Sequence, residues 1–281
     1  MDVNMPVRLR DGSGLTVRPM SPDDHAAVVS LIDTDWLPGQ HHPSRQFPLK
    51  PAKRLREAEI LVVCNVHGEV AGVVDVGVRL ADGAGLIVQL HGREDFEIVT
   101  ALLTVARAHL GQRTLYACTG PATATGIPGL PVEHRAVTAR ALTAAGFSPA
   151  SAQRYFLRDL TTAPPAPPEC PLADVTPIAD PPGWQLELTD TDGRHIATAI
   201  LRAPTPETAD MAVLWQLTVR HPNRRQGIAT RLLSQCLRHA AQHGAHHLTA
   251  DAPDGDIPAA HLLAGAGFLA LDTLTVYQRR L

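Results

Sequence analysis

The sequence predicts a mixed α/β fold (an α+β mixed sheet) built from two tandem domains, each a mixed β-sheet flanked by helices. Apolar runs typical of strands alternate with runs of helical periodicity along both halves of the chain. Between the halves, residues 161–172 contain five prolines, which cannot continue a helix or lie inside a sheet. We therefore expect domains at residues 1–160 and 173–281, joined by a linker at residues 161–172.

Elements of the first half follow from local patterns. A strand is expected at residues 15–18, followed by a helix that Ser21 caps and that runs to about Ile32. The remaining expected elements are a hairpin of residues 59–66 and 69–78 around His67-Gly68, a strand at 85–90, a helix at 96–110, a strand at 113–118, and a helix to Ala145.

The second half repeats this order. A strand is expected at residues 173–178, and Asp192-Gly193, a turn pair that accepts positive φ, predicts a hairpin. The expected elements are the hairpin strands 184–188 and 194–201, a strand at 210–219, a helix from about Gln226, a strand at 247–251, and a helix at 257–266.

Composition limits the functions that the chain can have. At 281 residues and 44% hydrophobic content, the chain can bury two medium cores. A net charge of −3 argues against nucleic-acid binding, and no apolar run approaches the roughly 20 residues that span a bilayer. The four cysteines form no Cys-x-x-Cys pair and the N-terminus is polar, so we expect a cytoplasmic protein, monomeric or homodimeric, whose partner is a small molecule.

The stretch from Leu217 to Leu233 predicts an anion site. An apolar strand runs through an Arg/Gly turn into a helix, whose first N–H groups have no partner within the helix. Gly227 allows the backbone to approach a ligand, and Ala229 keeps the wall of the site thin. Arg224 and Arg225 add positive charge beside the positive end of the helix dipole. A diphosphate fits such a site.

The run Arg224-x-x-Gly227-x-Ala229, within this order of strands and helices, resembles the acyl-CoA signature of the GCN5-related N-acetyltransferase (GNAT) superfamily. The tandem arrangement is similar to that of mycothiol synthase-like proteins, in which the second domain is active. The resemblance implies an acyltransferase that moves an acetyl group from acetyl-CoA to an amine of a small molecule. The alternatives are a non-catalytic acyl-CoA-binding regulatory protein and a protein N-acetyltransferase.

The resemblance also implies the cofactor contacts. The diphosphate would bind backbone amides of residues 225–230, and the pantetheine would run antiparallel to residues 217–219. The residues implied in acyl-CoA binding are Leu217, Thr218, Val219, Arg224, Arg225, Gln226, Gly227, Ile228, Ala229 and Thr230. No metal is expected, because the closely spaced His239 and His243 are more typical of a helix C-terminus that complements its dipole.

Both acid–base residues that are frequent in the family are missing. The usual Glu falls on Val213 or Trp215, and the usual Tyr falls on Leu263, which favours the regulatory alternative. The candidate catalytic substitutes are Asp251, His261 and Tyr277. In the alternative without a catalytic role, Asp251 caps a turn, His261 is a solvated helix residue and Tyr277 lies in the core.

The first half is a divergent copy. Aligning residues 98–103 with 228–233 places Glu94-Asp-Phe-Glu97 over Arg224-Arg-Gln-Gly227, with carboxylates where a diphosphate would lie. The first copy is therefore expected to bind CoA poorly or not at all, unless the register is wrong by a few residues. The second copy lacks room for the helices that usually cover the acceptor side, so we expect the first domain or a second subunit to cover it, or the cleft to be open.

Overall fold

The computed structural model describes residues 14–35, 37, 55–120, 126–162, 171–205 and 210–280, together with the backbone of residues 7–8. The chain forms two compact units. The first contains Met1–Ala122, Ile127–Ala152 and Thr273–Leu281, and the second contains Thr123–Gly126 and Gln153–Asp272. Most of the predicted linker, residues 163–170, lies outside the described residues.

The sheet of the first unit has the strand order β1-β2-β3-β4-β5-β6-β14. Only the pair β5–β6 is parallel, and the others are antiparallel. Its strands are β1 (Val7–Arg8), β2 (Thr16–Pro19), β3 (Leu55–Cys64), β4 (Val70–Arg79), β5 (Gly85–His91), β6 (Leu115–Ala117) and β14 (Leu269–Arg279), and β7 (Leu130–Pro131) pairs with β14. The predicted hairpin and the strands beside it are confirmed.

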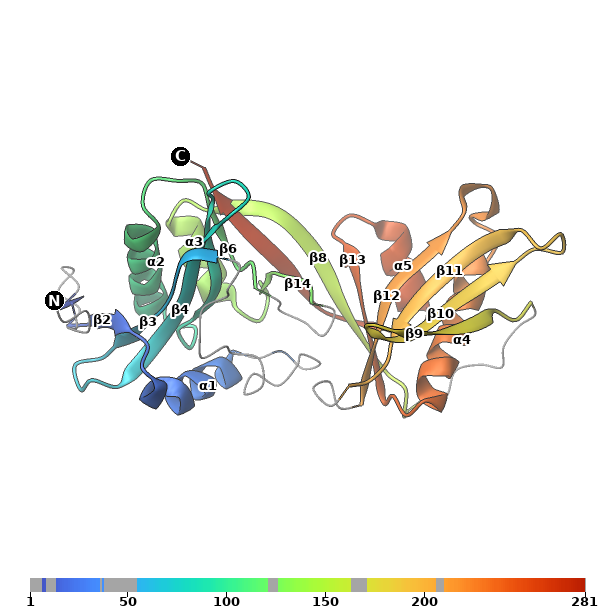
Figure 1. Cartoon of the computed structure of the whole chain (residues 1–281), viewed down its shortest axis with the longest axis horizontal. Coiled ribbons are helices and arrows are strands. Elements are labelled where there is room, and N and C mark those ends of the chain that lie inside the picture. Colours follow the sequence, from blue (N-terminus) through green and yellow to red (C-terminus); the bar gives the residue numbers. More distant parts are fainter. Residues whose placement is uncertain are drawn as a thin grey trace. The chain divides into compact units, whose positions relative to one another are not determined.

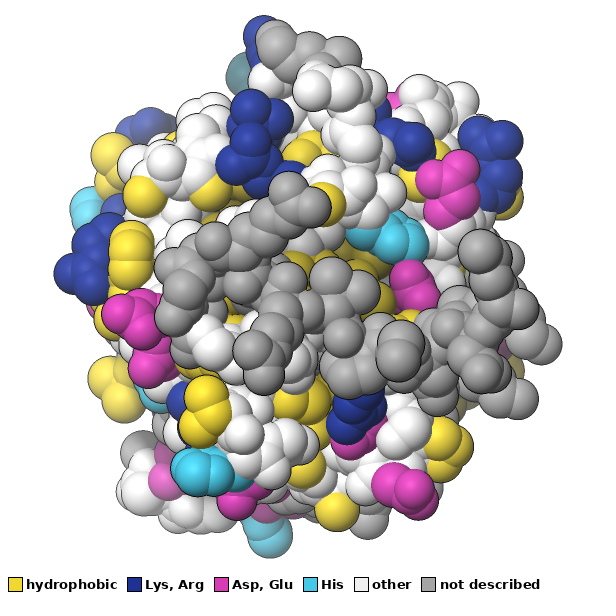
Figure 2. Space-filling view, turned by 90° about the vertical axis from the view of Figure 1, so that its left-hand side faces the viewer, with side chains coloured by type: hydrophobic (Ala, Val, Ile, Leu, Met, Phe, Trp, Pro, Cys, Tyr) yellow, Lys and Arg dark blue, Asp and Glu magenta, His cyan; other side chains and the backbone are white. Residues whose placement is uncertain are grey.

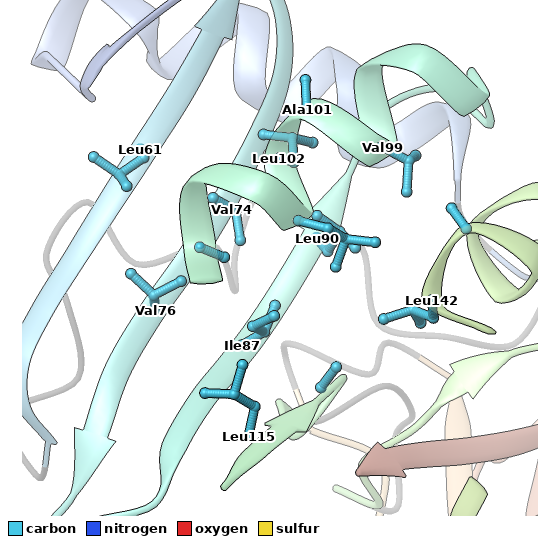
Figure 3. Close-up of a cluster of buried hydrophobic side chains, with 14 of the residues drawn as sticks. Leu61, Val74, Val76, Ile87, Leu90, Val99, Ala101, Leu102, Leu115 and Leu142 are labelled. Atoms are coloured by element: carbon cyan, nitrogen blue, oxygen red, sulfur yellow. The ribbon is translucent and has the colours of Figure 1, made fainter. Parts of the chain in front are cut away.

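Helices cover both faces of this sheet. On one face, α2 (Phe96–Leu110) and α3 (Ala136–Ala144) pack on the core that Figure 3 shows, in which Leu90, Leu102 and Leu142 are almost fully buried. On the other face, α1 (His25–Thr34) packs on alternate residues of β3 and β4. Ser21 and Asp24 form a capping box at the short helix η1 (Pro22–Asp24) that leads into α1, as the sequence predicted.

The sheet of the second unit has the order β8-β13-β12-β11-β10-β9, and only β12–β13 is parallel. Its elements are β8 (Ser148–Asp159), β9 (Asp174–Ala179), β10 (Pro182–Thr189), β11 (His195–Arg202), β12 (Met211–Val219), α4 (Ile228–Gln242), β13 (His247–Pro253) and α5 (Ile257–Gly265). The apolar stripe of α4, which includes Leu232, Leu233 and Cys236, packs on one face of this sheet. No helix among the described residues covers the opposite face.

The two halves of the sequence exchange their last strands, so that β8 contributes to the second unit and β14 to the first (Figure 1). β8 follows the first copy in sequence, yet its residues 153–159 pair with β13 of the second unit. β14 ends the chain, yet its residues 277–279 pair with β6 of the first unit. The compact units therefore differ from the sequence-based domains 1–160 and 173–281, because each copy completes its sheet with a strand from the other half.

On the face shown in Figure 2, the described residues form no basic patch. On the face in Figure 2, Lys and Arg side chains are scattered among acidic and hydrophobic ones. Within the described residues, no helix is both long enough and apolar enough to cross a bilayer. Cys64, Cys118 and Cys236 are buried free thiols.

Candidate functional site

The turn between β12 and α4 has the backbone conformation of an anion-binding loop. After β12 the chain passes through the short helix η3 (His221–Asn223), and Arg225 and Gly227 then adopt positive φ angles of 61° and 75°. A side chain at position 227 would be strained at that φ, and only open space lies where its Cβ would stand. Glycine therefore fits this position on conformational grounds, and α4 begins at Ile228, two residues later than expected.

The first turn of α4 keeps its N–H groups available. No described side chain caps Gly227, and the first backbone hydrogen bond of the helix runs from the N–H of Arg231 to the carbonyl of Gly227, at 3.0 Å. The arginines brace the turn instead: Arg224 Nε donates to the Val219 carbonyl at 3.0 Å, and the Arg231 guanidinium donates to the Gln226 carbonyl at 3.0 Å. Unpaired N–H groups and the helix dipole favour an anion at this point.

A cleft of about 890 Å³ opens in front of this turn. One side is formed by nine of the ten predicted cofactor residues, all except Gln226, whose side chain donates to the Pro222 carbonyl. The other side is the start of α5, with Asp256, Ile257, Pro258, Ala259, His261 and Leu262. Apart from His261, the α5 side was missed by the sequence analysis, although Asp256 is recognisable as an N-cap and accepts a hydrogen bond from the N–H of Ala259.

Next to the cleft, β12 and β13 part from each other. Their parallel pairing ends at Leu214 and Ala250; beyond this point β12 pairs only with β11, and β13 only with β8. The register of β12 against β11 also shifts here, so that Trp215 is an extra residue in a bulge. The edge of β12 that faces the gap is thus open to β-like hydrogen bonds with a ligand, as the sequence analysis expected for residues 217–219.

Asp251 lies at the mouth of this gap, one residue beyond the last paired position of β13. Its carboxylate pairs with no described residue, and burial raises its pKa to about 6. The residue opposite it on β8 is the fully buried Tyr155. An unpaired carboxyl group with a pKa near 6 is deprotonated at neutral pH and can accept a proton.

The other two catalytic candidates lie in different places. His261 is exposed on α5 and lines the cleft. Tyr277 does not reach the cleft, because β14 places it in the core of the first unit, where it is 5% exposed beside Cys118. The prediction for Tyr277 is therefore corrected: the strand exchange makes it a core residue of the first unit.

The corresponding loop of the first unit, within the described residues, is shorter and its helix is capped. The loop between β5 and α2 spans residues 92–95, four residues, against eight (220–227) between β12 and α4. Asp95 caps α2 by accepting hydrogen bonds from the N–H groups of Glu97 and Ile98 at 2.9 and 3.2 Å. The helix therefore satisfies its first N–H groups with its own carboxylate.

The first residues of α2 and α4 are offset by two from the internal alignment, although the buried residues Leu102, Leu103 and Ala106 match the buried Leu232, Leu233 and Cys236 in the expected register. By helix start, Asp95 corresponds to Gly227, and Arg93 corresponds to Arg225, both with positive φ. Glu94 consequently does not face α2. Its carboxylate instead accepts hydrogen bonds from the N–H groups of Val137 and Thr138, at 2.7 and 3.1 Å, and so caps α3.

A buried ion cluster fills the same region of the first unit. Arg135, 4% exposed, lies 3.3 Å from Glu94 and 3.0 Å from Asp35, which also contacts His91 Nδ1 at 3.0 Å. Burial opposes ionisation of Asp35, but His91 and Arg135 hold its pKa below the ordinary value. The ends of α2 and α3 that would face a diphosphate are thus occupied by side chains of the protein.

His239 and His243 pack against an aromatic side chain. Their rings stack 4.1 Å apart and pack against Trp184 at 4.7 and 4.6 Å. Among the described residues, no group of three or more His, Cys, Asp or Glu side chains is arranged to hold a metal ion.

Residues 154–268 match the model of the acetyltransferase (GNAT) family. The matched part includes the uncapped start of α4 and the strands β12 and β13 that part from each other. The family uses acetyl-CoA in general. No curated protein matches the chain in sequence.

Solved structures share the fold over nearly the whole chain. A GCN5-related N-acetyltransferase from Sphaerobacter thermophilus is 16% identical, with 97% of each chain covered and a TM-score of 0.63. A tandem GNAT protein from the clavulanic acid biosynthesis pathway is 16% identical, with 95% of this chain and 98% of that chain covered and a TM-score of 0.56. A GNAT-family acetyltransferase from Colwellia psychrerythraea is 13% identical, with 94% and 99% covered and a TM-score of 0.53. At these identities the likeness concerns the fold.

Proposed function

We propose that the second unit binds acetyl-CoA and transfers its acetyl group to the amine of a small molecule. The observation that carries the proposal is the uncapped start of α4, open to a cleft of about 890 Å³ beside the gap between β12 and β13. The first unit differs at the helix starts, because its loop before α2 is short and its helix ends carry carboxylate caps.

The residues of the cleft suit the parts of acetyl-CoA. The diphosphate is held by the backbone N–H groups at the start of α4, with Arg224 and Arg225 adding positive charge. The pantetheine lies along residues 217–219 and bonds to the open edge of β12. The thioester then reaches the mouth of the gap, beside Trp215 and Asp251.

The chemistry is acyl transfer. The nitrogen of a neutral amine attacks the thioester carbonyl carbon, a C–N bond forms, and the C–S bond breaks to release CoA as its thiolate. Asp251 accepts the proton that the nitrogen loses, which its pKa of about 6 permits at neutral pH. His261, which lines the cleft, protonates the leaving thiolate. Holding both reactants in one cleft supplies a large part of the rate.

A regulatory protein that binds acyl-CoA without catalysis is the second candidate. It is favoured by Leu263, which occupies the position of the family's frequent Tyr and is buried at 4% exposure. It is also favoured by Val213 and Trp215 on β12, neither of which can accept a proton.

Thiol release from acetyl-CoA across a panel of small amines, with calorimetry of acetyl-CoA binding, separates the two. For the enzyme, Asp251→Asn lowers kcat by about 100-fold or more, the usual contribution of a general base, without changing the Kd of acetyl-CoA. Asp192→Asn, an exposed carboxylate in the β10–β11 turn, is the matched control and keeps full activity. Tight binding with no turnover on any amine would support the regulator instead.

A further inference from the structure

Arg202, on β11, has no ionic partner among the described residues. Its guanidinium lies over the indole of Trp215, with Cζ 3.4 Å from the ring centroid. Its Nε is buried and has no hydrogen-bond partner, and burial lowers the pKa of the group. A guanidinium held in this way has lost water on its face and retains unused N–H donors along its edge.

Other charged groups on the same region of the sheet are already paired. Glu187, the acidic residue of β10, lies 2.7 Å from the amide nitrogen of Gln185 and 3.9 Å from His195. On β12, Gln216 donates to Thr218 at 3.1 Å. These groups do not pair with Arg202, whose Nε has no partner among the described residues.

The strand register places Arg202 on the same face as Asp251. Arg202 pairs with Val213, and Val213 pairs with Thr249, so these three side chains lie on one face. Asp251 is two residues beyond Thr249 and shares that face, which is the face opposite to α4. Two strand spacings of about 4.8 Å and two rises of about 3.3 Å separate the Cα atoms of Arg202 and Asp251 by roughly 12 Å.

This face is open only along β12 beyond Leu214. Trp215 is 45% exposed, and Gln216 and Thr218 are also exposed, whereas Val213 and Thr249 on the same face are 2% and 0% exposed. A small molecule that lies over the bulge of β12, beside Trp215, would have Arg202 on one side and Asp251 on the other. The separation of roughly 12 Å between their Cα atoms leaves space for a molecule of a few bonds' length.

We propose that the acceptor is a primary amine that also carries a carboxylate, and that Arg202, stacked on Trp215, binds this carboxylate while the amine lies beside Asp251. The planar fork of a guanidinium matches the two oxygens of a carboxylate, and stacking on an aromatic ring fixes the plane of the fork. The carboxylate also supplies the countercharge that the half-buried Arg202 lacks. The inference rests on the proposed function, since it names the acceptor for the same site.

The test compares amines that differ only in this charge. Glycine, 3-aminopropanoate, 4-aminobutanoate and 6-aminohexanoate are each assayed beside the corresponding primary amide, and 3-aminopropyl phosphate is added as a second anion. Thiol release gives kcat/KM for each compound with the wild type, Arg202→Met and Arg194→Met. Arg194 is an exposed arginine of the β10–β11 turn, so its variant makes the same change in net charge away from the site.

We expect at least one acid to be preferred over its amide by tenfold or more in the wild type and in Arg194→Met. In Arg202→Met the preference falls to within about twofold through a higher KM for the acid, while kcat/KM for the amide is unchanged. Arg202→Lys, which keeps the charge without the fork, recovers only part of the preference.

Three results would overturn the inference: amides that react as well as acids, an acid preference that survives Arg202→Met, or a preference for the phosphate over every carboxylate. Failure of the inference is distinguishable from failure of the proposed function. If acetyl-CoA binds and amides react without Arg202, the proposed function holds and this inference fails. If acetyl-CoA does not bind, the proposed function itself fails.

Discussion

Gly227 and Asp95 occupy equivalent positions in the two units, each immediately before the helix that follows a central strand. Asp95 caps its helix through two hydrogen bonds, whereas Gly227 begins its helix without a side chain and leaves the first N–H groups available. The first N–H groups of α2 are therefore bonded to a carboxylate of the protein, whereas those of α4 can bind an anion. The assignment of acetyl-CoA to the second unit depends on it.

Replacing Gly227 with Glu is expected to weaken acetyl-CoA binding by at least 100-fold. The substitution puts a carboxylate beside the diphosphate and an L side chain at φ 75°. Calorimetry measures the Kd, and Gly193→Glu, at φ 74° in the β10–β11 turn with open space around its Cβ, controls for backbone strain and charge. An unchanged Kd for Gly227→Glu would remove the diphosphate from this turn.

Glu94 is expected to stabilise the first unit rather than to take part in catalysis. Its carboxylate caps α3 and contacts the buried Arg135, so Glu94→Ala should lower the free energy of unfolding by about 2–4 kcal/mol. Glu97→Ala, an exposed residue of the first turn of α2, should change it by less than about 1 kcal/mol. Denaturant unfolding measures both, and equal effects would contradict the assignment of Glu94 as a cap.

Asp251 should impose a pH dependence on turnover. A base with a pKa of about 6 is protonated below that pH, so kcat/KM is expected to rise as pH increases through 6 and to level off above it. Asp251→Asn should abolish this limb of the profile as well as lower the rate. A limb that persists in the variant would assign the titration to a group other than Asp251.

Asp75 should make the first unit less stable in alkaline solution. It is 2% exposed on β4, its Oδ1 has no partner, and burial raises its pKa to about 7. The pKa of Asp75 is higher in the folded state than in the unfolded state. Its contribution to the free energy of unfolding is therefore fully present below about pH 4 and is lost as the pH rises through 7. Asp75→Asn should therefore stabilise the protein by about 2–4 kcal/mol at pH 8 and by little at pH 4. Thermal unfolding at the two pH values gives the result, and an equal effect at both would rule out a buried ionising carboxyl.

Much of the fold follows from local sequence. The helix at residues 96–110 and both hairpins lie where periodicity and turn residues place them, because those patterns act within one element. The exchange of β8 and β14 could not be predicted in this way. Alternation shows that a residue such as Tyr277 lies in a sheet, but the choice of neighbouring strand depends on contacts far apart in sequence.

The site was predictable where the motif is continuous. Nine of ten cofactor residues line the cleft because they are consecutive in a strand, a turn and a helix. The start of α2 could not be placed from the alignment, because the loop before α2 is four residues shorter than the loop before α4. Arg202 carried no sequence signal, since its contact with Trp215 arises from a bulge that brings two strands into a particular register.

The stoichiometry of acetyl-CoA binding tests the central claim most directly. Calorimetry on the full chain should give one site per chain, and none in Gly227→Glu, because α4 begins without a carboxylate cap whereas the corresponding helix α2 carries one. Two sites per chain, or one site that survives Gly227→Glu, would contradict the account by placing acetyl-CoA on the first unit or outside the turn before α4.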